Sequence, residues 1–314
     1  MTIERFRLLL AGIIEAEIGF NRERAIIYAS GFSSLKEFLA VSKSKLTGPT
    51  GVSGKPVLRI KKDQIELLDQ LRRKQLNAKQ TISENYIAAI SRKFAMRQVE
   101  MIRTMNLNTL NVNPLLVKAL NIHTPSELVS LHVEMAATRS IVTSMGFYLE
   151  QLVWASSESI EKAPRESNWD FKLKRGGRNH WLQIKSGTND MDKDQISHWA
   201  KKIEEKISAG DKAYIGIAYG NKSDGTVSLG LLKKYLPDWE MRVLVGKELW
   251  QFVSCDPQHH TRLCTILRQA ALTVLHKASI VSELNAAVKH ITAEFEAKYG
   301  HGEKAVEKFI HEIL

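Results

Sequence analysis

Three residues of contrasting chemistry lie near one another in the middle of the chain. Asp170 belongs to a short apolar segment, and Gln183 and Lys185 belong to the next one, beyond a Gly-rich turn. Because side chains alternate along a strand, Gln183 and Lys185 share one face while their apolar neighbours point into a core. A carboxylate, an amide oxygen and an ammonium group beside a sheet edge can hold a divalent cation and a phosphate together. The pattern predicts a hairpin suited to phosphodiester hydrolysis.

The segments around this hairpin predict a sheet that is interrupted by a helix. The helix is expected over about residues 192–208, where Asp192 and Asp194 complement the dipole at its start. Apolar segments typical of strands lie at 169–174, 180–186, 213–219 and 227–232, with another near 242–245. From Pro257 to the end the pattern is helical again, with a break at 299–302.

The first half of the chain has the apolar spacing of helices. Helical stripes cover residues 3–18 and 21–29, and Ser33-Ser34 precedes a third start. Thr81 and Glu84 form a capping-box pattern that opens a helix to about Met105. Thr124-Pro125-Ser126-Glu127 combines an N-cap hydroxyl, a proline and a glutamate, and it opens a helix to about Trp154, with an interruption expected near 144–146.

Positive charge is concentrated in the first part of the chain. The net charge is +11, and residues 1–120 contain 20 Lys and Arg against 10 Asp and Glu, so the remaining 194 residues carry only +1. Residues 43–74 alone hold nine basic residues against three acidic ones. Such a concentration favours a polyphosphate partner, although a solvated basic helical surface has the same composition.

Composition also bounds the class of protein. A chain of 314 residues with 44% hydrophobic residues can bury a substantial core in one large or two modest domains. It contains no apolar run long enough for a transmembrane helix, and its N-terminus lacks a secretory signal pattern. Two cysteines argue against a disulfide framework. We expect a cytoplasmic protein without a membrane partner.

The order of motifs over about residues 110–275 resembles type II restriction endonucleases of the PD-(D/E)XK superfamily, particularly the branch that cuts GGNCC-containing sites. The segments that carry this resemblance are 113–116, 127–129, Gly146-Phe147 with Glu150, Asp170, 183–187, 214–221 and 246–250. The resemblance implies an α/β fold, a PD-(D/E)XK nuclease core with a mixed central sheet flanked by helices. The basic, all-helical N-terminal domain lies outside it.

The resemblance also implies roles for the hairpin residues. Asp170, the side chain of Gln183 and the backbone carbonyl of Ile184 would ligate Mg²⁺, and Lys185 would orient the attacking water or stabilise charge on the phosphorane. Gln183 stands where the family usually has Glu or Asp, so the site has one negative charge fewer. Glu150 on the preceding helix would restore a charge. From the residues alone, Asp170 and Lys185 could also be a surface ion pair beside a solvated Gln183.

The sequence predicts a magnesium-dependent, site-specific double-stranded DNA endonuclease of a restriction–modification system. We expect a DNA-binding, recognition domain over 1–110, a catalytic domain over 111–314, a homodimer, and a cognate DNA methyltransferase as functional partner. Phosphate contacts are expected from basic residues of the N-terminal region, namely Lys55, Lys61, Lys62, Arg72 and Arg73. A repair or structure-selective nuclease, or a DNA-binding regulator with a decayed site, would share these features.

Two other motifs partly match an ATP-binding loop and a zinc site, but both matches are weaker than that of the hairpin. Residues 48–55 miss the spacing of an ATP-binding phosphate loop by one residue, and Pro56 replaces the hydroxyl that would hold magnesium. Cys255, His259, His260 and Cys264 could ligate zinc, but zinc sites usually join separate segments or use a CxxC knuckle. An ordinary helix is favoured for the second motif, and an inter-helix loop for the first.

Overall fold

The computed structural model describes residues 1–47, 58–236, 238–276 and 278–314. The chain divides into two compact units, and each is built from two segments. Unit 1 comprises residues 1–91 and 146–270, and unit 2 comprises residues 92–145 and 271–314. The sequence predicts a domain boundary near residue 110, and the two compact units are divided at other residues. The functional assignment, with a DNA-binding domain over 1–110 and a catalytic domain over 111–314, stays a prediction.

Unit 1 begins with short helices that pack around a common apolar core. They are α1 (Ile3–Ile18), α2 (Arg22–Ala29), α3 (Leu35–Ala40), η1 (Lys43–Lys45), α4 (Lys62–Gln70) and the π-helical turn η2 (Leu71–Gln75). The expected helix starts are confirmed: Asn21 caps α2 and Ser34 caps α3 through side-chain acceptors. Arg5 of α1 lies 3.6 Å from the ring centre of Trp154, which joins these helices to a later segment of the unit.

Three longer helices have residues in both units. They are α5 (Ile82–Arg103), α7 (Pro125–Ala155) and α12 (His259–Leu275). Both expected capping boxes are present, because Thr81 and Glu84 bond reciprocally, as do Thr124 and Glu127. The interruption expected near 144–146 is wrong, since α7 continues through Gly146. A single glycine costs a helix only about 1 kcal/mol, which the packing of a long helix outweighs.

A five-stranded mixed sheet forms the centre of the second half of unit 1, and its strands lie in chain order. They are β1 (Ile160–Lys162), β2 (Phe171–Arg175), β3 (Arg178–Lys185), β4 (Lys212–Ile217) and β5 (Val243–Val245). β1, β2 and β3 pair antiparallel, and β3, β4 and β5 pair parallel. The expected mixed α/β fold is thus present, and β1 is a strand that the sequence did not indicate.

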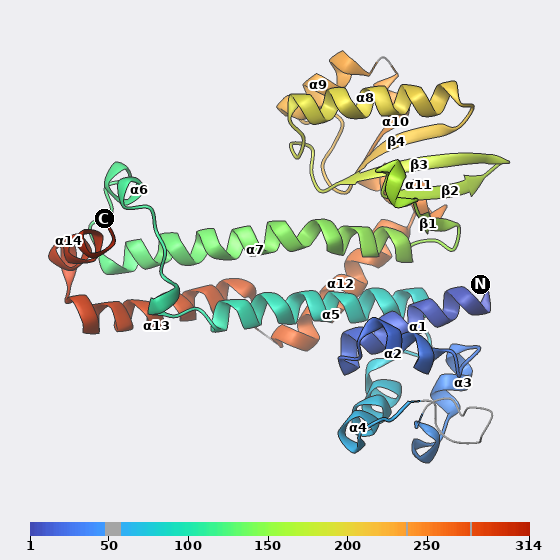
Figure 1. Ribbon diagram of the computed structural model, residues 1–314, viewed down its shortest axis with the longest axis horizontal. Coiled ribbons are helices and arrows are strands. Elements are labelled where there is room, and N and C mark those ends of the chain that lie inside the picture. The colour runs from blue at the N-terminus through green and yellow to red at the C-terminus, as the bar shows by residue number, and fades with distance from the viewer. Residues whose placement is uncertain (48–57, 237, 277) are drawn as a thin grey trace. The chain divides into compact units, whose positions relative to one another are not determined.

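Helices cover both faces of this sheet (Figure 1). On one face, α8 (Lys193–Ser208) and α9 (Val227–Tyr235) bury Ile196, Ile203 and Leu229 against the sheet. On the other, Leu249 of α11 (Lys247–Ser254) packs where Gly216 leaves room. A short helix α10 (Trp239–Arg242) precedes β5.

The strand expected over 227–232 is wrong, because those residues form α9. Thr226 caps this helix by accepting a hydrogen bond from the backbone of Leu229, and Leu229 and Leu232 then lie on one buried face. In an apolar run of this length, the periodicity of the residues does not distinguish a buried strand from a buried helix. The Thr226 hydroxyl, a typical helix N-cap, is the local signal that favours the helix.

Unit 2 is entirely helical in the described residues. Besides its parts of the three long helices it contains η3 (Leu107–Thr109), α6 (Pro114–Ala119), α13 (Ile280–Tyr299) and α14 (Gly302–Ile313). Its core includes Phe295, Tyr299 and Phe309, whose rings are within 5.4 Å of one another. Gly300 ends α13 with φ +94°, which confirms the expected break. No described helix is long and apolar enough to cross a membrane.

Candidate active site

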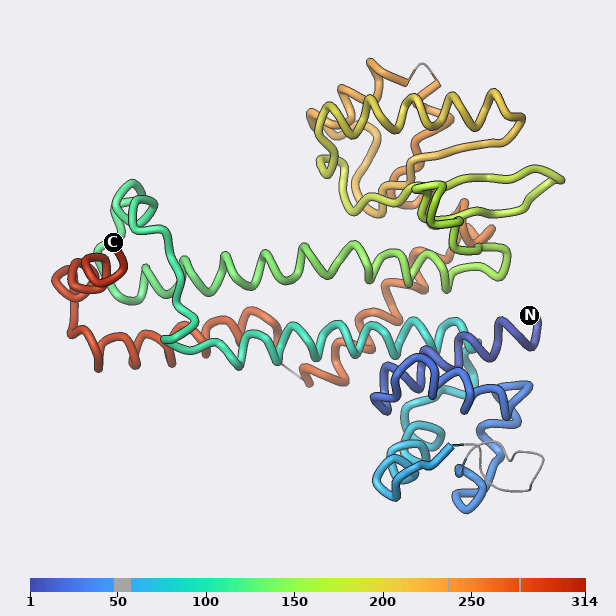
Figure 2. Tube along the Cα trace, viewed as in Figure 1, coloured from blue at the N-terminus to red at the C-terminus, as the bar shows by residue number. Residues whose placement is uncertain are grey.

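The predicted hairpin is formed by β2 and β3. Gly176 and Gly177 connect the strands with φ values of +57° and +73°, as a two-residue hairpin turn requires. Phe171 pairs with Leu182, and one further step along this register sets Asp170 opposite Gln183. The hairpin can be followed in Figure 2. Asp170 immediately precedes β2 rather than lying within it.

The carboxylate of Asp170 bends towards β3. Its Oδ2 accepts a hydrogen bond of 2.7 Å from the backbone N–H of Ile184. Asp170 is half-buried, and burial raises its pKa to about 6, while the Ile184 N–H opposes the rise. Glu150 raises this pKa further, and Lys162 and Lys185 lower it. These charges come from α7, β1 and β3, so three elements place them around one carboxylate.

Gln183 is buried rather than solvated. Only 9% of the residue is exposed, and its Oε1 has no hydrogen-bond partner among the described residues. An amide oxygen buried in this way costs about 1–3 kcal/mol unless something satisfies it. Lys185, two residues along the strand, lies with its Nζ 3.4 Å from Oε1 of Gln195 on α8. The solvated alternative for Gln183 is therefore wrong.

Glu150 reaches this region from α7, where it forms an ion pair with Lys162 of β1. Lys162 Nζ also lies 4.8 Å from the ring centre of Phe171 on β2. Lys162 is the charged neighbour of Asp170 that sequence reasoning did not identify. Its position depends on the pairing of β1 with β2, and a three-residue strand leaves almost no periodic signal in the sequence.

The residues present fit a hard divalent cation. Asp170 supplies a carboxylate, Gln183 supplies a buried amide oxygen that has no partner in the described parts of the chain, and the backbone of Ile184 touches the same carboxylate. A cation would satisfy that oxygen and offset the burial and the Glu150 repulsion that raise the pKa of Asp170. Groups of three or more His, Cys, Asp or Glu with metal-site geometry are absent from the described residues.

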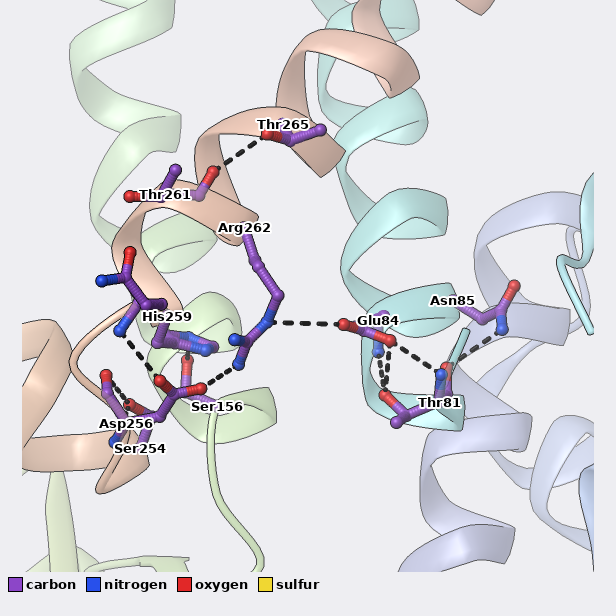
Figure 3. Close-up of polar contacts among 11 residues, drawn as sticks. Thr81, Glu84, Asn85, Ser156, Ser254, Asp256, His259, Thr261, Arg262 and Thr265 are labelled. Atoms are coloured by element: carbon purple, nitrogen blue, oxygen red, sulfur yellow. Dashed lines mark hydrogen bonds and ion pairs between the residues drawn. The ribbon is translucent and has the colours of Figure 1, made fainter. Parts of the chain in front are cut away.

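The Cys255–Cys264 segment forms an ordinary structural contact instead of a metal centre. Both cysteines are exposed, and Nε2 of His259 lies 2.8 Å from Oγ of Ser156 (Figure 3). Arg262 of the same helix forms ion pairs with Asp256 and, at 3.8 Å, with Glu84. These contacts connect α12 with the starts and ends of neighbouring helices of unit 1. The helix that was expected after Pro257 is present as α12.

The expected DNA-contacting residues differ in how accessible they are. Lys61 and Lys62 are exposed at the start of α4, and Arg73 is 61% exposed although its Nε lies 3.1 Å from Oδ1 of Asp69. The Arg72 side chain is only 10% exposed, because it pairs with Asp69 at 2.6 Å and donates to the carbonyl of Leu39. Lys55 lies outside the described residues.

The sequence model of one family, "Type II restriction endonuclease EcoO109I", matches residues 81–273, which is more than half of the chain. No curated protein matches the chain. The matched range includes Glu150, Asp170, Gln183 and Lys185, and it begins after the basic segment 43–74. The chain belongs to this family of type II restriction endonucleases and is an enzyme of that class, a site-specific DNA endonuclease of restriction–modification type.

Proposed function

We propose that this endonuclease hydrolyses phosphodiester bonds in double-stranded DNA with Mg²⁺, through a PD-(D/E)XK site made of Asp170, Gln183, Lys185 and Glu150. The observation that carries the proposal is the environment of Asp170. Its half-buried carboxylate has a pKa raised to about 6, beside Glu150, Lys162 and Lys185 from three separate elements. Strongly perturbed carboxylates with specific charged neighbours are concentrated at functional sites.

In this proposal each residue has a separate task. Asp170, the amide oxygen of Gln183 and the carbonyl of Ile184 would hold Mg²⁺, which when bound would polarise the phosphate and lower the pKa of a water molecule. Lys185 orients the attacking water and stabilises the negative charge that develops on the phosphorane. The Ile184 N–H fixes the rotamer of Asp170 through its 2.7 Å hydrogen bond. Glu150 restores the charge that Gln183 lacks, and its pairing with Lys162 moderates that charge.

Gln183 is buried and uncharged, and both properties suit it to the position where the family usually has Glu or Asp. A second carboxylate at 9% exposure, opposite Asp170, would suffer like-charge repulsion in a poorly hydrated site. The amide supplies a ligand oxygen without that repulsion. Its weaker affinity for Mg²⁺ is the corresponding cost.

We further propose that the basic N-terminal region contacts DNA phosphates. Lys61, Lys62 and Arg73 are accessible for this role, whereas Arg72 also stabilises the local fold through Asp69. Lys55 is included in the proposal from its place in the basic segment alone. A homodimer would match two cuts in a near-palindromic site of the GGNCC class. A cognate methyltransferase would protect the host DNA at the same site.

Supercoiled plasmid of known sequence tests this function directly. Incubation with Mg²⁺ should give discrete fragments, and EDTA should abolish them. Sequenced fragment ends should share one site. A smear or random nicks would contradict site specificity, and intact plasmid that is still bound would contradict an active nuclease.

The DNA-binding surface has its own test. The Lys61→Ala, Lys62→Ala, Arg73→Ala variant should bind DNA more weakly, and its slope of log K against log salt should be shallower by about 0.9 for each phosphate that the variant no longer neutralises. A Lys233→Ala, Lys234→Ala variant on α9, which removes two positive charges where the test variant removes three, serves as the control. An unchanged slope in the first variant would move the DNA surface elsewhere.

A further inference from the structure

Tyr219 is an exposed aromatic residue next to the proposed catalytic edge. It follows β4 by two residues and is 62% exposed. Its hydroxyl has no hydrogen-bond partner in the part of the chain that the structure describes. The exposure of this large ring contrasts with the buried setting of Tyr214 on β4, which is 8% exposed.

The backbone of Tyr219 is attached to the end of β3. The N–H of Ala218 donates to the carbonyl of Lys185 at 2.9 Å, and the N–H of Tyr219 donates to the carbonyl of Ser186 at 3.2 Å. The Trp250 indole N–H donates to the carbonyl of Ala218 at 3.0 Å. Tyr219 is therefore held directly beside the residue after Lys185.

The ring of Tyr219 occupies the space where a side chain at position 187 would lie. A Cβ on Gly187 would be 2.6 Å from the Tyr219 hydroxyl oxygen and 2.7 Å from Cζ. Gly187 has no positive φ, so its backbone would accept alanine. The ring lies directly over Gly187, so a side chain at position 187 would displace it, and the phenol lies two residues from Lys185.

The loop after Tyr219 is held by polar contacts. Lys222 forms an ion pair of 2.7 Å with Glu248 and donates to the carbonyl of Glu240 at 2.8 Å. The N–H of Asn221 donates to Asp224 at 2.9 Å. An exposed ring on a backbone fixed in this way loses little conformational entropy when it binds a ligand. These contacts leave the phenol itself as the accessible group.

We propose that the Tyr219 hydroxyl donates a hydrogen bond to a DNA phosphate adjacent to the scissile one and so aligns the strand over Lys185. The proposal rests on the proposed active site at Lys185. A phosphate suits the phenol because it is the acceptor that repeats along the strand, and tyrosine is among the residues that contact DNA phosphates. A hydrogen bond to a charged acceptor is also stronger than one between neutral groups.

The first test compares Tyr219→Phe with the unchanged enzyme on a short duplex that contains the mapped cut site. Ca²⁺ replaces Mg²⁺ so that binding is measured without cleavage. Loss of one hydrogen bond to a charged group should weaken binding about tenfold or more. A series of duplexes then carries a methylphosphonate in place of one phosphate at a time. At one position next to the scissile phosphate, this replacement should weaken binding by the unchanged enzyme but should not further weaken binding by Tyr219→Phe. If the penalty at every position is the same in both proteins, the proposal is overturned.

The second test uses the packing of the ring on Gly187. Gly187→Ala should displace the ring and weaken DNA binding to the same extent as Tyr219→Ala, and the double variant should be no worse than Tyr219→Ala alone. Gly225→Ala is the matched control, because a Cβ there meets nothing within 4 Å. Additive losses in the double variant would contradict the proposal. Thermal unfolding of each variant identifies any that fails to fold.

Failure of this inference can be distinguished from failure of the active site. Lys185→Ala should bind the duplex and fail to cut it. If Lys185→Ala still cuts, the proposed site is wrong. If Lys185→Ala is inactive while Tyr219→Phe binds and cuts normally, the site stands and the role of Tyr219 is overturned.

Discussion

Asp170 and Asp256 are carboxylates of the same compact unit with opposite surroundings. Asp256 pairs with Arg262 and accepts a hydrogen bond from the backbone of Gln258, and the Arg262 hydrogen bond leads the causes that lower its pKa. Asp170 has a pKa raised to about 6, first by burial and then by Glu150. In the network of Figure 3, Arg262 forms ion pairs with both Asp256 and Glu84 and so joins helices. At the other site, Glu150 pairs with Lys162, whereas the Asp170 carboxylate accepts a hydrogen bond from the Ile184 N–H and has no ion pair among the described residues.

This difference separates a structural polar cluster from a candidate catalytic one. Groups that only hold a fold together tend to be paired, since an unsatisfied buried polar atom lowers stability. Within the described structure the unpartnered Oε1 of Gln183 departs from that rule, and the half-buried Asp170 carboxylate has a hydrogen bond from the Ile184 N–H in place of an ion pair. Local departures of this kind are expected where a protein binds something else. The comparison can be tested by changing each cluster in turn.

The largest expected effect is on cleavage. Asp170→Ala and Lys185→Ala should each lower the single-turnover cleavage rate by about 100- to 1,000-fold or more, because each removes a group that acts on the reacting phosphate. DNA binding should remain. Asp256→Ala is the control, and it should cut at close to the original rate. Equal losses in Asp256→Ala and Asp170→Ala would remove the distinction between the two clusters.

The sequence identified much of this arrangement in advance. The start of α1, the capping boxes of α5 and α7 and the β2–β3 hairpin follow from local signals, because apolar period, capping residues and a Gly-Gly turn are encoded within a few residues. The period of the hairpin indicates Asp170, Gln183 and Lys185. The family pattern indicates Glu150.

Other parts depend on contacts between distant residues. Lys162 reaches Asp170 only because β1 pairs with β2, and the burial of Gln183 depends on helices that pack on the sheet after the hairpin has formed. The partial burial of Arg72 depends on Asp69 and the carbonyl of Leu39. No local pattern contains these facts. The apolar run at 227–232 predicts a strand, but these residues lie in a helix over 227–235 that buries Leu229 and Leu232.

Gln183 should show the next largest effect. Gln183→Ala removes an oxygen ligand and should lower the cleavage rate at limiting Mg²⁺ by about 10- to 100-fold, in line with losses at metal surroundings. Gln183→Glu should be tolerated far better, because it keeps an oxygen at the same position. The rates should be compared at limiting and saturating Mg²⁺. Equal rates for the alanine and glutamate variants would show that Gln183 does not face the metal.

The raised pKa of Asp170 predicts competition between protons and Mg²⁺. Only the ionised carboxylate binds the cation, so cleavage at limiting Mg²⁺ should increase as pH rises through about 6. Higher Mg²⁺ favours the ionised form and should move this midpoint to lower pH. A pH series at several Mg²⁺ concentrations measures the shift. If the pH midpoint of cleavage does not change with Mg²⁺ concentration, the titrating group does not bind the metal.

The smallest expected effects are on stability, and the two carboxylates should differ in sign. Because folding raises the pKa of Asp170, ionisation of Asp170 destabilises the folded state above pH 6. Asp170→Asn should therefore increase the free energy of unfolding by about 1–3 kcal/mol at pH 7.5 in EDTA, and this gain should disappear as pH falls through 6 towards 4. Because folding lowers the pKa of Asp256, Asp256→Asn should instead decrease Tm at pH 7.5, and the decrease should shrink progressively as pH falls below about 4 towards the lowered pKa. Thermal unfolding across this pH range measures both. A loss of stability in Asp170→Asn at pH 7.5 would mean that its carboxylate is stabilised by the fold, as that of Asp256 is, and the contrast between the two clusters would fail.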